Sequence, residues 1–367
     1  MAVALFDTSA PLEPLHEQLR AAIERVLESG RYILGPEVSA FEREFASHCG
    51  AAHGVGVANG TDAITIALRA MRVGEGDEVV VPSFTFYASA EAIPPTGARP
   101  VFCDIDPETY CVTPDTVKAA LTARTKAVLA VHLFGNVAPI AEIEALGVPV
   151  LEDAAQAAGS NGPDGRPGAL GRAATFSFFP SKNLACFGDG GMITTSDSEI
   201  AELARTLRFH GSHDKVTYER VGYNSRLDEL QAAILRVQLP HLDSWAQGRR
   251  AAGSHYEQAG LGELVALPRP GDGAEPAWHL YVVRHPDVER LEDALKAREI
   301  GCKAYYRTPI HRQPAMRAWA GALELPGTEQ AASTHLAIPM SPVLTREQAE
   351  EVVAAVRDTR ALRAAGY

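Results

Sequence analysis

The chain lacks the features of membrane proteins, secreted proteins and nucleic-acid-binding proteins. Its 367 residues contain no apolar run near the ~20 residues that are needed to span a bilayer. Acidic side chains interrupt the N-terminus, which has no basic segment and no long apolar core, so we expect no signal peptide. The net charge of −12 disfavours a nucleic-acid binder, which normally presents a basic face. We therefore expect neither a membrane nor a nucleic acid as a partner.

The cysteine and glycine patterns exclude further classes. The five cysteines are scattered and form no C-x-x-C pair, which argues against a disulfide framework or a zinc site and fits a reducing cytoplasm. No set of cysteines and carboxylates completes a metal site around His210 and His213, so we expect no metal. Neither G-x-G-x-x-G nor G-x-x-x-x-G-K-[ST] occurs, which disfavours a nicotinamide dehydrogenase and a P-loop enzyme.

What the chain does contain is an alternation of helical and strand-like stretches. Hydrophobic residues make up 46% and charged residues 22%, a balance typical of globular proteins. The alternation predicts crossover units, and hence an α/β fold with a mostly parallel central sheet covered by helices. The expected strands are 54–58, 78–82, 100–103, 126–131, 148–152, 175–179 and 191–195. The expected helices are 15–29, 39–49, 62–71 and 114–121.

The pattern changes near residue 240. Residues 228–242 predict one long helix with Pro240 near its end, and another helix follows Trp245. An irregular patch rich in proline and glycine comes next, then a strand at 280–284 and helices at 289–298 and from Thr345 onward. We therefore predict a large domain at 1–240 and a small α+β domain at 241–367.

The segment TFSFFPSKNLACFGDGG, from Thr175 to Gly191, carries a lysine in a turn after an apolar strand. Desolvation beside apolar walls disfavours the ammonium form of such a lysine and makes Lys182 a usable nucleophile for a carbonyl. An ordinary surface lysine is the competing interpretation. Ser177, at the end of the same strand, faces the same edge of the predicted sheet.

Asp153 ends another apolar strand, in PVLEDAAQAAGS. Open α/β sheets bind their ligands at the carboxyl ends of the strands. A carboxylate there can pair with a protonated ring nitrogen and make the ring an electron sink, and Gln156 is close enough in sequence to reach the same ring. Alternatively, Asp153 caps a following helix.

Two more segments supply parts of a site that could bind an anion and a flat ring. In GVGVANGTDAITIAL, Gly60 allows close backbone approach, and the free N–H groups of the next helical turn form an anion cradle with the Thr61 hydroxyl. In VPSFTFYASA, an aromatic side chain just past a strand end can stack on a flat cofactor. An ordinary capped helix and core aromatics are the competing interpretations. Read alone, Asn224 and Arg226 in GYNSRLDELQAAIL fit a helix cap and an ion pair with Asp228 or Glu229.

A turn lysine, a ring-nitrogen carboxylate, a ring stacker and a phosphate cradle follow successive strands in one chain. Together these four parts are what pyridoxal 5'-phosphate requires, so we predict it as the cofactor.

The chain also resembles the DegT-type nucleotide-sugar aminotransferases, which have the aspartate-aminotransferase fold (fold type I). The motifs that carry the resemblance span nearly the whole length. They include GRYILGPEVSAFEREFA, ANGTDA, PSFTFYASAEAI, DIDPETY, VHLFG, LEDAAQAAGS, SFFPSKNL, GDGG, GYNSRLDELQAAIL and HRQPA.

The resemblance implies a role for each matching residue. Lys182 is the implied covalent attachment point and proton carrier, and Asp153 is the implied partner of the ring nitrogen. Gln156 is the implied neighbour of the ring oxygen, and Phe86 the stacking aromatic. The implied phosphate cradle consists of Gly60, Thr61, Asp62 and Ser177, with Asn224 reaching it from a second subunit of a homodimer.

The resemblance further implies L-glutamate as the amino donor and a nucleotide-linked keto sugar as the acceptor. The 3-keto branch is the most similar, with UDP- and dTDP-linked sugars both open. Tyr32, Arg226, Tyr305 and His311 are the candidate substrate contacts, although this chain has Tyr305, Tyr306 and Arg307 where relatives often have His-Tyr-Pro. A keto-cyclitol aminotransferase and a non-catalytic ligand-sensing relative are the alternatives. A dehydratase of the same fold would have histidine in place of Lys182.

Overall fold

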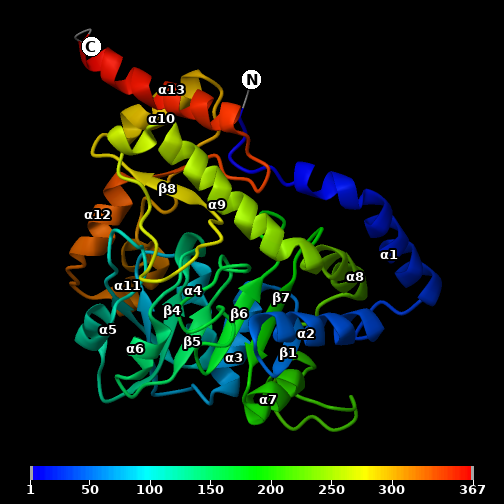
Figure 1. The fold of residues 1–367 in the computed structure, drawn as a ribbon. Helices are drawn as coiled ribbons and strands as arrows, with labels where there is room; N and C mark the ends of the chain where they lie inside the picture. Colours follow the sequence, from blue (N-terminus) through cyan, green and yellow to red (C-terminus); the bar gives the residue numbers. More distant parts are fainter. Residues whose placement is uncertain (1–2, 365–367) are drawn as a thin grey trace.

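The computed structural model describes residues 3–364, and for 359–364 it describes only the backbone. A central sheet of seven strands has the order β1-β7-β6-β5-β4-β2-β3 (Figure 1). All neighbouring pairs are parallel except those of β7, which runs antiparallel to both β6 and β1. The strands are β1 (His53–Val57), β2 (Glu78–Pro82), β3 (Arg99–Cys103), β4 (Thr125–Val131), β5 (Val150–Asp153), β6 (Ala173–Ser177) and β7 (Gly191–Thr195).

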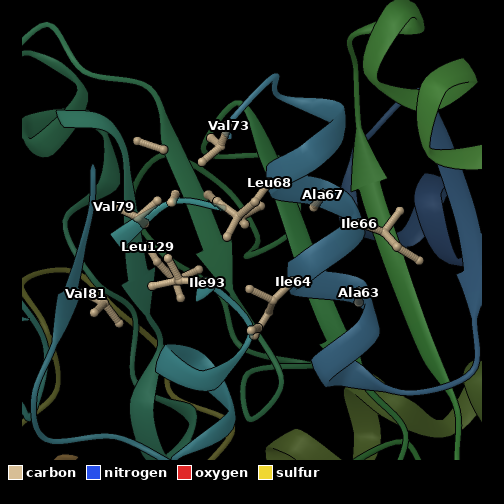
Figure 2. Close-up of a cluster of buried hydrophobic side chains, with 14 of the residues drawn as sticks. Ala63, Ile64, Ile66, Ala67, Leu68, Val73, Val79, Val81, Ile93 and Leu129 are labelled. Carbon is tan, nitrogen blue, oxygen red and sulfur yellow. The ribbon is translucent and has the colours of Figure 1, made fainter. Parts of the chain in front are cut away.

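Helices cover both faces of this sheet because its strands are apolar on both sides. Val79 and Leu129 face α3 (Gly60–Ala70), which packs its Ile64 and Leu68 against them (Figure 2). Val80, between Val79 and Val81, points to the opposite face, where it packs in a second buried cluster. This alternation follows from the two-residue repeat of a strand.

The remaining helices complete the layers and the C-terminal part. They are α1 (His16–Ser29), α2 (Pro36–Cys49), α4 (Ala88–Glu91), α5 (Pro114–Ala120), α6 (Ile140–Glu144), α7 (Ser198–Arg208), α8 (Glu229–Gln238), α9 (Leu242–Gln258), α10 (Val288–Ala297), α11 (Arg317–Ala320), α12 (Pro326–Thr334) and α13 (Arg346–Ala364). A second, antiparallel sheet pairs β8 (Tyr281–Arg284) with β9 (His335–Ile338). Its apolar side chains form one core with α9, α10 and α13, on the side of the molecule where both termini lie (Figure 1).

The predicted strands are all present, and several element ends differ. The single long helix predicted for 228–242 is wrong: α8 ends at Gln238, and a 3₁₀ turn at Leu239–His241 separates it from α9. Pro240 lies inside this turn, as expected for a residue that lacks a backbone N–H. Six elements escaped prediction, namely the helices α4, α6, α7, α11 and α12 and the strand β9. The division of the chain at residue 240 stays a prediction.

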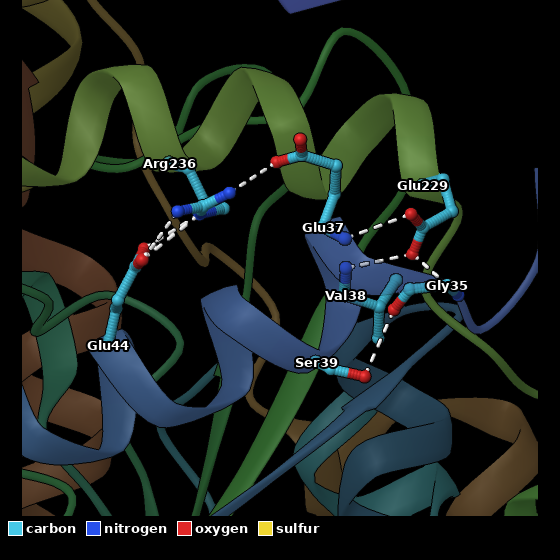
Figure 3. Close-up of polar contacts among 7 residues, drawn as sticks. All are labelled: Gly35, Glu37, Val38, Ser39, Glu44, Glu229 and Arg236. Carbon is cyan, nitrogen blue, oxygen red and sulfur yellow. Dashed lines mark hydrogen bonds and ion pairs between the residues drawn. The ribbon is translucent and has the colours of Figure 1, made fainter. Parts of the chain in front are cut away.

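Glu229 fixes the relative position of two helices that are far apart in sequence. Its carboxylate accepts hydrogen bonds from the backbone N–H groups of Gly35, Glu37 and Val38 at 2.7–2.9 Å, at the start of α2 (Figure 3). The carboxylate thereby satisfies N–H groups that have no partner within α2 and lies at the positive end of the helix dipole. The suggested ion pair between Glu229 and Arg226 is therefore wrong. Arg226 instead donates to the side chain of Asn224.

Candidate active site

A cavity of about 430 Å³ lies where three neighbouring parallel strands end. Val131 ends β4, Asp153 ends β5 and Ser177 ends β6, and all three residues line the cavity. The sheet therefore places its ligand site where open α/β sheets normally have one. The predicted residues that line the cavity are Gly60, Thr61, Phe86, Asp153, Gln156, Ser177, Lys182 and Tyr305.

Lys182 enters the cavity from the turn that follows β6. Its backbone N–H donates to the carbonyl of Phe179 at 2.8 Å, which closes the turn, and its side chain is partly buried. Desolvation lowers the pKa of the Lys182 ammonium to about 8, and the nearby Asp153 carboxylate opposes part of that shift. A substantial fraction of the amine is therefore neutral near pH 8 and able to attack a carbonyl.

Asp153 is only 5% exposed, and its carboxylate is held on both oxygens. Ser89 Oγ donates to Oδ2 at 2.7 Å, and the backbone N–H of Ala155 donates to Oδ1 at 3.1 Å. No helix follows β5 directly, so the interpretation of Asp153 as a helix cap is wrong. The carboxylate faces the cavity that Lys182 also lines.

Gln156 presents its amide in a fixed orientation. The backbone N–H of Phe134 donates to Gln156 Oε1 at 2.7 Å. The carbonyl end of the amide is therefore occupied, and Nε2 is the end that donates, here to the hydroxyl of Tyr306 at 3.4 Å. Burial raises the pKa of Tyr306, so its hydroxyl stays protonated.

The start of α3 approaches the end of β6 closely. Asn59 caps the helix by accepting from the backbone N–H of Asp62 at 2.8 Å. Gly60 allows the approach, because a Cβ at this position would come within 2.8 Å of the Ser177 Cβ. The free N–H groups of the first turn and the hydroxyls of Thr61 and Ser177 thus share one wall of the cavity, as an anion such as phosphate requires.

Phe86 is an aromatic side chain that the rest of the protein does not bury. Its ring is 54% exposed and lines the cavity, whereas Phe84, two residues earlier, is fully buried in the core. The Phe86 ring lies 6.0 Å from the ring of Tyr306, measured between centroids. This exposed apolar face is suited to stack on a flat ring bound in the cavity.

Comparisons with known proteins identify the family. The model of the DegT/DnrJ/EryC1/StrS aminotransferase family matches residues 14–357. The chain belongs to this family. Its members depend on pyridoxal 5'-phosphate, so the DegT-type chain is a pyridoxal-phosphate-dependent aminotransferase with an α/β fold of type I.

Several relatives of this DegT-type chain are similar over almost their whole length. A "Pleiotropic regulatory protein" of Geobacillus stearothermophilus is 45% identical (96% of this chain, 97% of the relative). The dTDP-3-amino-3,4,6-trideoxy-alpha-D-glucose transaminase of Streptomyces venezuelae is also 45% identical (97% and 96%). The UDP-N-acetyl-3-dehydro-alpha-D-glucosamine 3-aminotransferase of Acidithiobacillus ferrooxidans is 41% identical (98% of each). The X-ray structure of S. venezuelae DesV superposes with a TM-score of 0.94, at 44% identity, covering 97% of this chain and 98% of that one.

The cavity of this DegT-type chain fits pyridoxal phosphate. Its volume lies within the range of small-molecule sites. Any side chain at Gly60 would fill the space of the cradle, and the first turn of α3 suits the phosphate group. Lys182 would hold the cofactor covalently, Asp153 would face its ring nitrogen, and Phe86 would cover its ring. Bound there, the cofactor supplies an aldehyde that accepts an amino group and a ring that withdraws electrons from the reacting carbon.

Five of the predicted site residues do not line the cavity within one chain. Asp62 donates only its backbone N–H to the helix cap. Asn224 and Arg226 bond to each other, and Tyr32 is exposed. His311 is buried, with Nδ1 2.5 Å from Ser83 Oγ and Nε2 3.3 Å from Glu329 Oε1. The roles assigned to these residues stay predictions.

Several cavity residues escaped the sequence analysis. Thr85, Tyr306, Phe6 and His279 all line the cavity, and the Phe6 and His279 rings stack with centroids 5.9 Å apart. Burial, with Lys182 nearby, lowers the pKa of His279 well below its usual range, so this imidazole is neutral. Phe6 and His279 are far from the motif segments in sequence, and only the folded chain brings them to the cofactor site.

Among residues 3–358, whose side chains the structure describes, no group of three or more His, Cys, Asp or Glu side chains could hold a metal ion. No helix in the described part of the chain is long and apolar enough to cross a membrane. His132 is a core histidine, with Nε2 2.9 Å from Glu152 Oε2 and Nδ1 accepting from the backbone N–H of Ala138.

Proposed function

We propose that this aminotransferase moves an amino group from L-glutamate to a 3-keto sugar carried on UDP or dTDP, in amino-sugar biosynthesis. The observation that carries the proposal is one cavity in which a lysine of lowered pKa and a buried, hydrogen-bonded carboxylate face the same ligand space. Two relatives with more than 40% identity support the acceptor class, since both are named for 3-amino or 3-keto nucleotide sugars.

Lys182 performs the proton transfers in both halves of the proposed cycle. With pyridoxal phosphate bound, the neutral Nζ of Lys182 would be the group that accepts the proton from the α-carbon of the donor and later returns it. A pKa near 8 suits both directions, because the amine can accept and release a proton near neutral pH. The keto sugar then enters the same cavity, and the transfers run in reverse, so the kinetics should be ping-pong.

Asp153 would assist these proton transfers from a fixed carboxylate, held by Ser89 and by the Ala155 N–H. It would pair with the ring nitrogen of the bound cofactor and keep the ring cationic, which would stabilise negative charge at the reacting carbon. Gln156 would donate from Nε2 to the ring oxygen, because its carbonyl end already accepts from the Phe134 N–H. Phe86 would exclude water from one face of the ring.

The acceptor contacts are proposed with Tyr305 at their centre, since Tyr305 lines the cavity. Arg226 and Tyr32 would contribute from a neighbouring subunit, with Arg226 able to bind an anionic group of the sugar or nucleotide. His311 would contribute indirectly, through Ser83, whose hydroxyl it contacts. The chain has Tyr305, Tyr306 and Arg307 where relatives often have His-Tyr-Pro, so this wall is the one that would select the sugar.

We further propose a homodimer in which Asn224 reaches the phosphate cradle of the partner. Asn224 follows a segment with exposed apolar side chains, Val216 and Val221, that are 80% and 81% exposed in one chain. A two-fold interface would cover these side chains and complete both sites. Mixing Lys182→Ala with Asn224→Ala protein should then restore activity that neither variant has, because one intact site forms in each mixed dimer. No recovery after subunit exchange would refute the shared site.

The cytoplasm is the proposed location. All five cysteines, Cys49, Cys103, Cys111, Cys186 and Cys302, are unpaired thiols in the structure, which suits a reducing compartment.

The absorbance spectrum of the purified protein, before and after L-glutamate, tests the donor and the use of the site. The expected result is a visible cofactor band that glutamate converts, with Lys182→Ala showing no such conversion. The converted enzyme is then offered UDP- and dTDP-linked 3-keto sugars, a 4-keto sugar and a keto-cyclitol. Turnover with the 3-keto sugars supports the proposal, and turnover with the cyclitol alone overturns it. No cofactor band after soaking with pyridoxal phosphate would favour a ligand-sensing role instead.

A further inference from the structure

A chain of two hydroxyl groups lies behind Asp153. Ser89, in α4, places its Oγ 2.7 Å from Asp153 Oδ2, and Thr85 Oγ1 lies 3.1 Å from the same Ser89 oxygen. Both hydroxyl-bearing residues are 1% exposed. Thr85 lines the cavity, whereas Ser89 does not.

The direction of both hydrogen bonds follows from the number of protons. An ionised carboxylate can only accept, so Ser89 must donate its single hydroxyl proton to Asp153. Ser89 then has only lone pairs left for Thr85, so Thr85 must be the donor in the second bond. Each donor in this chain thus points toward the carboxylate, and such aligned bonds strengthen one another.

We infer that Ser89, supported by Thr85, is the positioning residue that aims the Asp153 carboxylate at the ring nitrogen of the cofactor. The inference rests on the proposed role of Asp153. With Oδ2 held by Ser89 and Oδ1 held by the Ala155 N–H, the carboxyl group cannot rotate without losing a bond to a charged acceptor. A hydrogen bond to a charged group in a buried site is among the stronger kinds, because the low dielectric of such a site strengthens it.

The same short segment also positions the stacking ring. Ser89 donates its backbone N–H to the carbonyl of Phe86 at 3.1 Å, which makes residues 86–89 a single turn. Phe86 points into the cavity from this turn, and Ser89 points behind it to Asp153. One rigid turn therefore sets both the face on which the ring rests and the orientation of the carboxylate that meets its nitrogen, a coupling that favours a preorganised site.

The test compares Ser89→Ala with Asp153→Asn and with the double variant, using the dissociation constant of pyridoxal phosphate and the steady-state kinetics. Thr65→Val is the matched control, since Thr65 is a buried hydroxyl that donates to the carbonyl of Ala92, away from the cavity. Ser89→Ala should weaken cofactor binding about tenfold and lower kcat by about 10- to 100-fold, with KM for glutamate changed less than about twofold. Thr85→Val should also weaken cofactor binding and lower kcat, each by a smaller factor than Ser89→Ala.

The double variant separates positioning from a general structural effect. In the Asp153→Asn background, Ser89→Ala should add less than about a threefold loss of cofactor affinity, because the charged acceptor is already gone. An undiminished tenfold loss in that background, or values for Ser89→Ala equal to those of Thr65→Val, would overturn the inference. If Asp153→Asn binds the cofactor and turns over as the wild type does, the proposed role of Asp153 fails, and with it the inferred role of Ser89 and Thr85.

Discussion

Gly60 lies against Ser177 so closely that a Cβ at residue 60 would come within 2.8 Å of the Ser177 Cβ. The two residues come from different elements, α3 and β6, and both line the cavity in which the cofactor phosphate is expected. Glycine at residue 60 permits this close approach, whereas any residue with a Cβ would collide with Ser177.

Gly60→Ala should therefore weaken pyridoxal phosphate binding about tenfold or more, because Ser177 and the first turn of α3 must move apart. Titration of the cofactor-free protein, followed by absorbance, measures the change. Gly74→Ala is the control, since a Cβ there would have only one ordinary contact, 3.9 Å from the Thr96 carbonyl. Equal affinities of the two variants would show that the close approach does not shape the cradle.

Covalent capture of the cofactor should become faster with rising pH, with a midpoint near 8. Only the neutral amine of Lys182 attacks the aldehyde, and desolvation lowers its pKa to about 8 from an ordinary value of 10.5. Stopped-flow absorbance between pH 6 and 10, on cofactor-free protein, gives the midpoint. A midpoint near 10.5 would mean that Lys182 is fully solvated before the cofactor binds.

The same desolvation predicts that Lys182 destabilises the cofactor-free fold. Between pH 8 and 10.5 the unfolded chain binds this proton and the folded chain does not, so stability rises with pH across that window. Below pH 8 the full penalty is present. Lys182→Met should therefore stabilise the cofactor-free protein by about 1–2 kcal/mol at pH 7, after allowance for partial solvent screening. Urea unfolding at pH 7 and pH 10 measures the gain, which should shrink at the higher pH; a constant gain would point to better packing by methionine instead.

Glu229→Gln should destabilise the protein by about 1–3 kcal/mol, because a charged acceptor for three N–H groups at the start of α2 becomes neutral. Chemical denaturation gives the free energy of unfolding. Glu199→Gln is the control, since Glu199 forms only an exposed pair with Arg72 at 3.9 Å and should change stability by less than about 0.5 kcal/mol. A similar small change for both variants would show that the Glu229 contacts do not stabilise the fold.

Local sequence was sufficient for the seven strands of the central sheet and for the residues at their ends. Short apolar runs rich in β-branched residues mark β2 and β4, because both strands are buried on both faces. Since parallel strands end at one edge, Asp153 and Lys182 could be placed in one crevice before any contact was known. The residues at that edge also predicted the chemistry, because a lysine, a carboxylate and an anion cradle together suit pyridoxal phosphate.

Contacts between distant segments had no local signal. Ser89 lies in an alanine-rich turn, and nothing in FYASA indicates that its hydroxyl reaches Asp153, 64 residues later. Glu229 seemed suited to pair with neighbouring Arg226, yet it caps a helix that begins 193 residues earlier. His279 and Phe6 reach the cavity only because the folded chain brings their two distant segments to the ends of the central strands.

The sequence by itself thus determined the fold class and the cofactor, because these depend on the pattern of apolar runs and on the order of strand ends, whereas the residues that bind the cofactor stay a prediction. Only the tertiary structure decided which hydroxyl holds the Asp153 carboxylate, which amide end Gln156 presents, and how far the Lys182 pKa falls. Those properties depend on distances between side chains and on the loss of water around them, and a linear pattern carries neither.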